Sequence, residues 1–253
     1  MPELVARIRR KRYPGVGDAP PHTALEAVEV GVAAGDFVAI VGPSGCGKTT
    51  FLNIVAGLDR DFEGELRLGP LADGRPPRIG YVFQNPRLLP WRTVHENIAL
   101  VLRPGQDRSI VDDLLSEMGV HEARDVYPSR LSVGMSRRVA IARAFAIEPD
   151  LLLMDEPFAS LDAATADRLR ELLVGTLKLR PASVLLVTHD LREAVSLADR
   201  ILLLSPAPGR LLAQVPIGLP RERRGDPRVI EALYAEVTQK QRTAMAPGAT
   251  GPT

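Results

Sequence analysis

The sequence predicts an α/β protein built on a mainly parallel core sheet. Short, continuously apolar runs alternate along the chain with helix-forming segments. This alternation is typical of strands that are buried on both faces and joined by helices. The runs that predict buried strands are Asp36–Val41, Ile79–Phe83, Leu151–Met154, Val184–Val187 and Ile201–Leu204.

Other segments alternate apolar with polar or small residues, which predicts half-buried antiparallel strands at an edge of the domain. These segments are Leu4–Arg10, Ala24–Val32 and Glu63–Leu68. Helices are predicted at Lys48–Ala56, Ser109–Met118, Ser136–Ala146, Ala163–Lys178 and Leu191–Ala198. Asp162 stands where an N-cap for the Ala163 helix belongs, and Asp190 with Glu193 has capping-box spacing.

The domain organisation follows from where these patterns change. Leu88–Arg130 carries helix signals without a buried strand signal, which predicts a helical subdomain inserted at about 88–149. The sheet pattern stops after Val215. We predict one domain at 1–215, a linker and a helix at 216–241, with the helix itself at Pro227–Gln241, and a disordered tail at 242–253.

Composition narrows the class of protein. The 253 residues are 45% hydrophobic and 25% charged, as in ordinary globular proteins, and the formal net charge of +1 gives no electrostatic case for nucleic-acid binding. The single cysteine, Cys46, excludes an intrachain disulfide and fits a reducing compartment. No apolar run reaches the roughly 20 residues that span a bilayer, and the basic start, Met1–Arg12, is not followed by a signal-peptide core. We expect a soluble cytoplasmic chain that can still bind a membrane protein.

The sharpest motif is GPSGCGKT at Gly42–Thr49, which fits G-x-x-x-x-G-K-[ST] in full. It follows a predicted buried strand and opens a predicted helix. In this context backbone N–H groups surround phosphate oxygens, Lys48 reaches the β- and γ-phosphates, and the Thr49 hydroxyl binds Mg²⁺. The residues predicted to bind the nucleotide are Gly42, Pro43, Ser44, Gly45, Cys46, Gly47, Lys48, Thr49 and Thr50.

Polar residues at the ends of two other predicted strands complete a hydrolytic set. Asp155 and Glu156 follow Leu151–Met154, and strand ends are where open α/β sheets bind ligands. We predict that Asp155 holds Mg²⁺ and that Glu156 is the general base for the attacking water. Gln84 follows Ile79–Phe83 and can reach the metal or the water.

Two further segments predict anion contacts. The sequence LSVGM at 131–135 opens the Ser136–Ala146 helix, so the Ser132 hydroxyl and nearby N–H groups form a second anion site. His189 follows the Val184–Val187 strand, where it can contact a γ-phosphate.

Together these motifs resemble the ATP-binding subunits of ABC transporters over about residues 4–215. The stretches that carry the resemblance are GPSGCGKTTFLNIVAGL, YVFQ, LSVGMSRRVAIARAFAIEPDLLLMDEPFASLD and VTHD. It implies a P-loop NTPase with a RecA-like core sheet, an antiparallel β edge subdomain and a helical subdomain. It also implies an ATPase that uses ATP and Mg²⁺, in a homodimer that ATP binding closes and hydrolysis reopens.

In such a dimer each ATP lies between the phosphate loop of one subunit and the LSGGQ-type segment of the other. The resemblance implies that Ser132 and Gly134 act across the dimer, that Ser160-Leu161-Asp162 contacts the partner, and that Tyr13 stacks on adenine. Val133 departs from the family pattern, which usually has Gly at this position. Because Val disfavours positive φ, we expect it to be tolerated if the backbone there is helical and to slow hydrolysis if it is not.

The segment Leu88–Trp91, LLPW, resembles the ATPases of nitrate, sulfonate and taurine importers. The resemblance implies import of such a small solute through a separate membrane permease that docks near Leu88, Leu89 and Trp91. A periplasmic or lipid-anchored solute-binding protein would act indirectly, with this chain peripheral on the cytoplasmic face of the membrane. The alternative is that Trp91 fills the core of the helical subdomain.

Other functions are open to a chain with a phosphate loop. A kinase of the same fold predicts no second anion-binding helix start, so LSVGM and Thr188-His189-Asp190 argue against it. An ABC ATPase that acts on DNA or ribosomes predicts tandem cassettes, coiled-coil arms or a basic surface, and the sequence has none of these. No nucleic-acid partner is expected.

Overall fold

The computed structural model describes residues 3–15, 17, 20–71, 73–224 and 226–245. The chain divides into two compact units. The central unit is Pro76–Ala182, and the terminal unit combines Pro2–Arg75 with Ser183–Thr253. The predicted helical insertion at 88–149 falls inside the central unit, while the limits predicted for the whole domain stay a prediction.

The terminal unit contains an antiparallel sheet and a group of mainly parallel strands. The antiparallel sheet has the order β2-β1-β4, with β1 at Leu4–Tyr13, β2 at His22–Val32 and β4 at Glu63–Leu68. The other strands have the order β7-β3-β8-β9, at Ser183–Thr188, Phe37–Val41, Arg200–Leu204 and Leu211–Pro216. Strands β7, β3 and β8 are parallel, and β9 runs antiparallel to β8.

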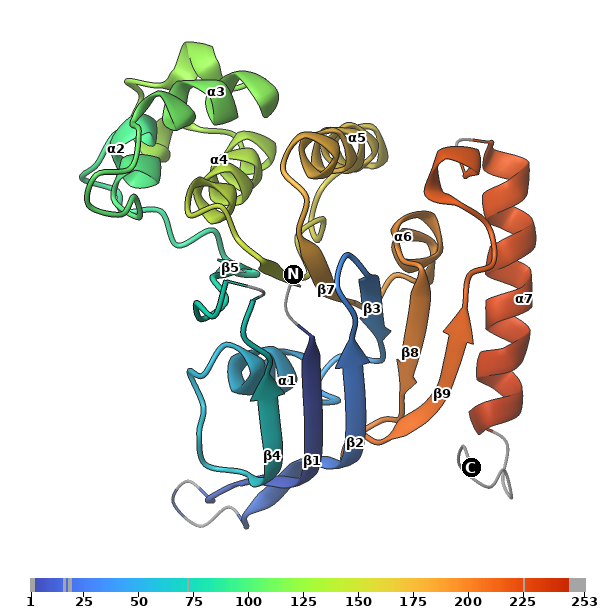
Figure 1. Cartoon of the computed structure of the whole chain (residues 1–253). Coiled ribbons are helices and arrows are strands. Elements are labelled where there is room, and N and C mark those ends of the chain that lie inside the picture. Colours follow the sequence, from blue (N-terminus) through green and yellow to red (C-terminus); the bar gives the residue numbers. More distant parts are fainter. Residues whose placement is uncertain (1–2, 16, 18–19, 72, 225, 246–253) are drawn as a thin grey trace. The chain divides into compact units, whose positions relative to one another are not determined.

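The helices of the terminal unit cover these strands. They are α1 at Lys48–Val55, α6 at Leu191–Leu197, the 3-10 turn η3 at Arg221–Arg223 and α7 at Pro227–Met245. Helix α1 contacts both β2 and β7, and α7 packs along α6 and β9 (Figure 1). Strand β3 is buried along its whole length, as its apolar sequence predicts.

The central unit consists of a strand pair and a group of helices. Strands β5 at Ile79–Val82 and β6 at Leu151–Asp155 pair in parallel. The helices are α2 at Val94–Ala99, α3 at Ser109–Glu117, α4 at Val133–Ala146 and α5 at Ala163–Leu179, with 3-10 turns η1 at His121–Ala123 and η2 at Pro128–Arg130. Helix α4 contacts α2, α3, α5 and β5, so it is the packing centre of this unit (Figure 1).

This architecture confirms the predicted fold class. Every strand and helix predicted from the sequence is present within a few residues of its predicted bounds. Among the described residues, no helix is both long enough and apolar enough to cross a membrane.

Several boundaries differ from the prediction. Helix α4 begins at Val133 instead of Ser136, because the Ser132 side chain caps it by accepting from the backbone N–H of Met135 at 3.2 Å. Strand β9 was not predicted. Helix α7 continues to Met245, into the predicted disordered tail at 242–253, and residues 246–253 of that tail lie outside the described part of the chain.

The predicted cap at Asp162 is confirmed, since its carboxylate accepts from the backbone N–H of Thr165 at 3.0 Å. The predicted capping box at Asp190 and Glu193 is wrong. Asp190 caps α6, but its backbone N–H donates to the Thr188 hydroxyl at 2.9 Å. That hydroxyl in turn donates to the Glu193 carboxylate at 2.6 Å, so the buried Thr188 supplies the partner that a capping box would have provided.

Candidate active site

The phosphate loop joins β3 to α1 in the terminal unit. Gly45 and Gly47 have φ values of +77° and +98°, in the left-handed region that favours glycine. Gly47 is the N-cap of α1 and offers no capping side chain. Because the N-cap has no side chain, the start of α1 is open to the close approach of a phosphate.

Lys48 and Gly42 show how tightly this loop is folded. Lys48 is only 5% exposed, and its Nζ donates to the carbonyls of Gly42 at 2.8 Å and Pro43 at 3.0 Å. A Cβ on Gly42 would lie 2.7 Å from the Cys46 sulfur and 3.1 Å from Cβ of Leu204. The buried Cys46 therefore fills space beneath the loop, and Gly42 has no room for a side chain.

His189 leaves the same edge of the same unit. Strands β3 and β7 are parallel, with Val41 opposite Thr188. Gly42 and His189 come directly after these two residues, so both leave the strand ends side by side. The His189 side chain is exposed, while the hydrogen bond between Thr188 and Glu193 braces the turn that carries it.

Tyr13 is linked to the phosphate loop through its hydroxyl. That oxygen lies 3.3 Å from Thr50 Oγ1 and 3.2 Å from Asp59 Oδ2. Lys11 Nζ lies 4.6 Å from the centre of the Tyr13 ring and donates to Asp59 Oδ1 at 2.8 Å. The His22 ring lies 5.4 Å from the Tyr13 ring, centre to centre. The Tyr13 ring therefore has the ammonium of Lys11 and the ring of His22 as neighbours.

Gly209 packs closely against the phosphate loop at Cys46. Sequence reasoning missed this contact. The N–H of Gly209 donates to the carbonyl of Ala24 and its carbonyl accepts from the N–H of Glu26, both at 2.9 Å. A Cβ on Gly209 would clash with the carbonyl oxygen of Cys46. The Pro208-Gly209 dipeptide signals a turn, but nothing in it signals contact with the phosphate loop.

In the central unit, Gln84, Asp155 and Glu156 leave one edge of the β5–β6 pair. The strands are parallel, with Val82 opposite Met154, so the residues that follow leave the strand ends together. Asp155 is 3% exposed, Glu156 is half-buried and Gln84 is exposed. Glu156 has a φ of +45°, a strained conformation for a residue with a side chain that persists only where its surroundings impose it.

Asp155 affects the pKa of the nearby Tyr81 hydroxyl. Burial raises the pKa of the Tyr81 hydroxyl, the negative charge of Asp155 raises it further, and Arg87 lowers it. Tyr81 is therefore a neutral phenol at neutral pH.

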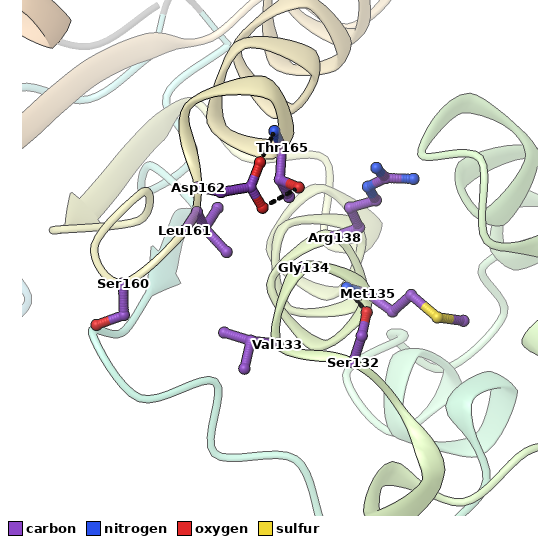
Figure 2. Close-up of a pocket in the computed structure, with 9 residues that line it drawn as sticks. All are labelled: Ser132, Val133, Gly134, Met135, Arg138, Ser160, Leu161, Asp162 and Thr165. Atoms are coloured by element: carbon purple, nitrogen blue, oxygen red, sulfur yellow. Dashed lines mark hydrogen bonds between the residues drawn. The ribbon is translucent and has the colours of Figure 1, made fainter.

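A pocket of about 340 Å³ lies where α4 and α5 begin (Figure 2). Its lining comes from the starts of these two helices and the loop before α5, and consists of Ser132, Val133, Gly134, Met135, Arg138, Ser160, Leu161, Asp162 and Thr165. The residues that the family resemblance assigns to contacts across a dimer therefore line one pocket of the central unit.

The backbone conformation at this pocket decides whether Val133 can replace the usual glycine. Ser132 is the N-cap of α4 and Val133 is its first residue, so the backbone is helical and Val is tolerated there. The Val133 side chain is 56% exposed at the pocket. Gly134 is buried, and a Cβ on it would lie 2.8 Å from Cγ2 of Thr165. Gly134 therefore also allows the close approach of α4 and α5.

The loop at 86–93 holds the LLPW sequence, and Trp91 is 69% exposed on it. The interpretation of Trp91 as a core residue is therefore wrong. The loop is held by the fully buried Asn97. Its Oδ1 accepts from the N–H of Leu89 at 2.7 Å, and its Nδ2 donates to the carbonyls of Leu89 at 3.1 Å, Arg92 at 3.0 Å and Thr93 at 2.9 Å.

Arg143 holds the start of the same loop. It donates to the carbonyls of Pro86 at 2.6 Å and Arg87 at 3.0 Å. Leu88 and Leu89 are half-buried between these anchors. Sequence reasoning missed both anchors, and the signal for Asn97 was a polar residue beside Val94 and Ile98 on a buried helix face.

Comparison with known proteins agrees with this geometry. The sequence pattern of the ABC transporter family matches residues 25–159. The chain is 47% identical over 228 residues to the aliphatic sulfonates import ATP-binding protein SsuB 2 of Burkholderia lata, which is 88% of this chain and 81% of that protein. It is 42% identical over 243 residues to the corresponding SsuB 1 of Pseudomonas savastanoi pv. phaseolicola, covering 94% and 97% of the two chains.

Solved structures give the same result. The dimeric structure of MJ0796, a bacterial ABC transporter cassette, matches with a TM-score of 0.73 at 30% identity and covers 85% of this chain and 98% of that one. A dimer of the same cassette in a post-hydrolysis state, bound to ADP and Pi, matches with a TM-score of 0.72 at 29% identity. With the phosphate loop, the Asp-Glu pair and the LSVGM segment all present, the chain belongs to the ABC transporter family.

Proposed function

We propose that this chain is the ATP-hydrolysing subunit of an importer for an aliphatic sulfonate or a similar small solute. The observation that carries the proposal is the complete phosphate loop, folded between a buried strand and the start of α1, where Gly47 is the N-cap. The names of the similar proteins from Burkholderia and Pseudomonas, which are aliphatic sulfonate import ATP-binding proteins, support this solute class.

The proposed chemistry assigns each candidate residue a role. Lys48 and the loop N–H groups bind the phosphates of ATP, and Tyr13 stacks on adenine. The Glu156 carboxylate accepts a proton from the water that attacks the γ-phosphorus, while the bond from phosphorus to the ADP oxygen breaks. Gln84 and His189 orient the water and the γ-phosphate.

The donor set fits Mg²⁺. The Thr49 hydroxyl, the Gln84 amide oxygen and the buried Asp155 carboxylate are oxygen donors, which Mg²⁺ prefers in combination with substrate phosphates. Among the described residues, no group of three or more His, Cys, Asp or Glu could hold a metal alone. A cation held largely by ATP is therefore the form of site that these residues support. When bound, Mg²⁺ neutralises charge on the phosphate oxygens.

A homodimer completes the proposed site. Ser132, Gly134 and Ser160-Leu161-Asp162 share one pocket wall, and we assign them to the nucleotide and phosphate loop of the partner subunit. Hydrogen bonds from Thr165 to Asp162 lower the pKa of that carboxyl, so Asp162 is charged at this surface. The dimeric cassettes among the similar structures support this arrangement.

The proposed membrane partner is a separate permease. Its docking site would be the 86–93 loop, where an exposed tryptophan stands on a backbone held by Asn97 and Arg143. The chain would then lie peripherally on the cytoplasmic face of the membrane. A periplasmic or lipid-anchored solute-binding protein would deliver the solute to the permease without touching this chain.

The variant Glu156→Gln tests the hydrolytic function. An amide cannot accept the proton from water, so phosphate release should fall at least about 100-fold while calorimetry still detects ATP binding. Sedimentation should show a dimer that forms with ATP. The companion variant Lys48→Ala should lose Mg-ATP binding, because the ammonium contacts with the phosphates are gone. Near-normal phosphate release by Glu156→Gln would refute the assignment.

The solute is tested in the assembled transporter, because the permease and the solute-binding protein select it. The chain should be purified with the permease encoded beside it and reconstituted in vesicles. Uptake of a short alkanesulfonate should depend on ATP. Uptake of taurine or nitrate without uptake of the alkanesulfonate would move the proposal to another solute class.

A further inference from the structure

Arg137 on α4 is a buried arginine to which the sequence motifs assign no role. It is 6% exposed and lies in the second turn of the helix that Ser132 caps. Its Nη1 lies within hydrogen-bond distance of the carbonyls of Phe83, at 3.4 Å, and Gln84. Its Nη2 lies 3.4 Å from the carbonyl of Ala159. One side chain thus contacts the segment that carries Gln84 and the loop that follows Glu156.

The loop after Glu156 requires outside support. Glu156 and Ser160 both have positive φ, at +45° and +65°, although neither is glycine. Such residues keep strained backbone only where their surroundings hold it. The N–H of Ala159 donates to the carbonyl of Glu156 at 3.2 Å, so the Arg137 contact with Ala159 is one step from the candidate base.

The electrostatics of Arg137 are unusual for a structural residue. Among the described residues, its Nε–H is buried without a hydrogen-bond partner. Burial lowers the pKa of Arg137, and the charges of Asp155 and Glu156 raise it. A buried donor without a partner costs stability, so the value of this side chain lies in its hydrogen bonds to the three carbonyls.

We propose that Arg137 is a positioning residue that ties the Gln84 segment to the Glu156–Asp162 loop. The planar guanidinium suits this task, because it presents donors on separate nitrogens in a fixed geometry. Movement of α4 at Ser132 would then move the water-orienting amide and the general base together. This inference rests on the proposed function, since it concerns how that catalytic set is held.

The test compares Arg137→Met and Arg137→Lys with the matched control Arg180→Met. Arg180 also lies in the central unit, where its Nη2 pairs with Glu117 at 3.0 Å, and its ion-pair partners include none of the candidate site residues. For each variant the measurements are the melting temperature, ATP affinity by calorimetry, the kcat of phosphate release, and amide hydrogen exchange across residues 83–87 and 156–162.

In Arg137→Met, kcat should fall about 10- to 100-fold, because displaced catalytic groups lose their alignment. ATP affinity should stay within about twofold, since the phosphate loop belongs to the terminal unit. Amide exchange should accelerate in both segments. Arg137→Lys keeps the charge but has one nitrogen, so kcat should stay low while the protein folds. Arg180→Met should lower the melting temperature and keep kcat.

Three results would overturn the proposal. They are a kcat within about twofold of wild type in a folded Arg137 variant, faster exchange in only one segment, or an equal loss of kcat in Arg180→Met. If Arg137→Met fails to fold, Arg137→Lys decides. Normal hydrolysis by Glu156→Gln would instead refute the proposed function, whereas an inactive Glu156→Gln beside active Arg137 variants would refute only this inference.

Discussion

Lys11 is a buried charged residue beside Tyr13, and its interactions are mainly with two aspartates. It is 3% exposed, and its ammonium donates to Asp59 and to the carbonyl of Asp61. Burial alone would lower the pKa of Lys11, but the two aspartates raise it above its ordinary value of 10.5. Burial alone would raise the pKa of Asp59, but the hydrogen bond from Lys11 lowers it below 3.8. Both groups are therefore charged at neutral pH.

Removing this ammonium should destabilise the fold in a pH-dependent way. Lys11→Met leaves Asp59 without its cation, so the free energy of unfolding at pH 7 should fall by about 1–3 kcal/mol. The depressed pKa of Asp59 means that the pair stabilises above pH 3.8 and that this contribution is lost as pH falls below it. The raised pKa of Lys11 means that it is also lost as pH rises beyond 10.5.

Urea unfolding from pH 7 down to acid measures this difference. The difference in the free energy of unfolding between wild type and Lys11→Met should become smaller as Asp59 becomes protonated. The control is Arg10→Met, which removes the exposed ion pair with Glu63 from the neighbouring position and should change stability little. A gap that stays constant through the acid range would show that the ion pair is not its cause.

The helices and strands that the sequence predicted are those with a clear burial pattern or a motif at a fixed spacing. Strands buried on both faces, such as β3 and β6, are uniform apolar runs. Strand β9 was missed because it is an edge strand and, apart from Val215, is half-buried or exposed. The site residues divide in the same way. Residues that belong to motifs were predicted, whereas Arg137, Asn97 and Arg143 were missed. These three bind backbone carbonyls, and because every residue type has a carbonyl, such contacts leave no pattern in the sequence.

The close packing of α4 on α5 at Gly134 predicts that a larger residue there is destabilising and that a second substitution can restore stability. In Gly134→Ala the new Cβ would lie 2.8 Å from Cγ2 of Thr165, so the protein should lose about 1–3 kcal/mol of stability. Adding Thr165→Ser removes that methyl group and keeps the hydroxyl that donates to Asp162 at 2.7 Å. The melting temperature should then recover. If the double variant stays as unstable as Gly134→Ala, the steric account fails.

The loop at 86–93 gives a second prediction at this scale. Because the Trp91 side chain is 69% exposed, Trp91→Ala should leave the melting temperature of the isolated chain nearly unchanged. In a pull-down with the permease, affinity should fall by about 2 kcal/mol, roughly 30-fold.

The matched control is Leu179→Ala, which removes another exposed apolar side chain, 70% exposed at the end of α5. It should affect neither measurement. Unchanged permease binding by Trp91→Ala would refute docking at this loop.

At the scale of the whole molecule, the candidate residues are divided between the two units. Tyr13, Lys48 and His189 belong to the terminal unit, whereas Glu156 and Ser132 belong to the central unit. Neither unit alone holds the full set, so we expect hydrolysis to require the intact chain. In the proposed dimer, each site also requires Ser132 of a second copy.

A mixed dimer tests the contact across subunits. Combining Lys48→Ala chains with Ser132→Arg chains puts both lesions into one site and leaves the other site intact. Phosphate release should therefore partly recover relative to either homodimer. If Ser132 acts within its own subunit, both sites carry a lesion and the mixture should be as inactive as the homodimers.

The anchoring of the 86–93 loop has a consequence for how such subunits diversify. Asn97 and Arg143 grip only its main-chain atoms. These hydrogen bonds therefore do not depend on which side chains the loop carries. If the permease docks at this loop as proposed, substitutions at Leu88 and Trp91 should alter which permease is recognised while the hydrogen bonds that hold the loop stay in place.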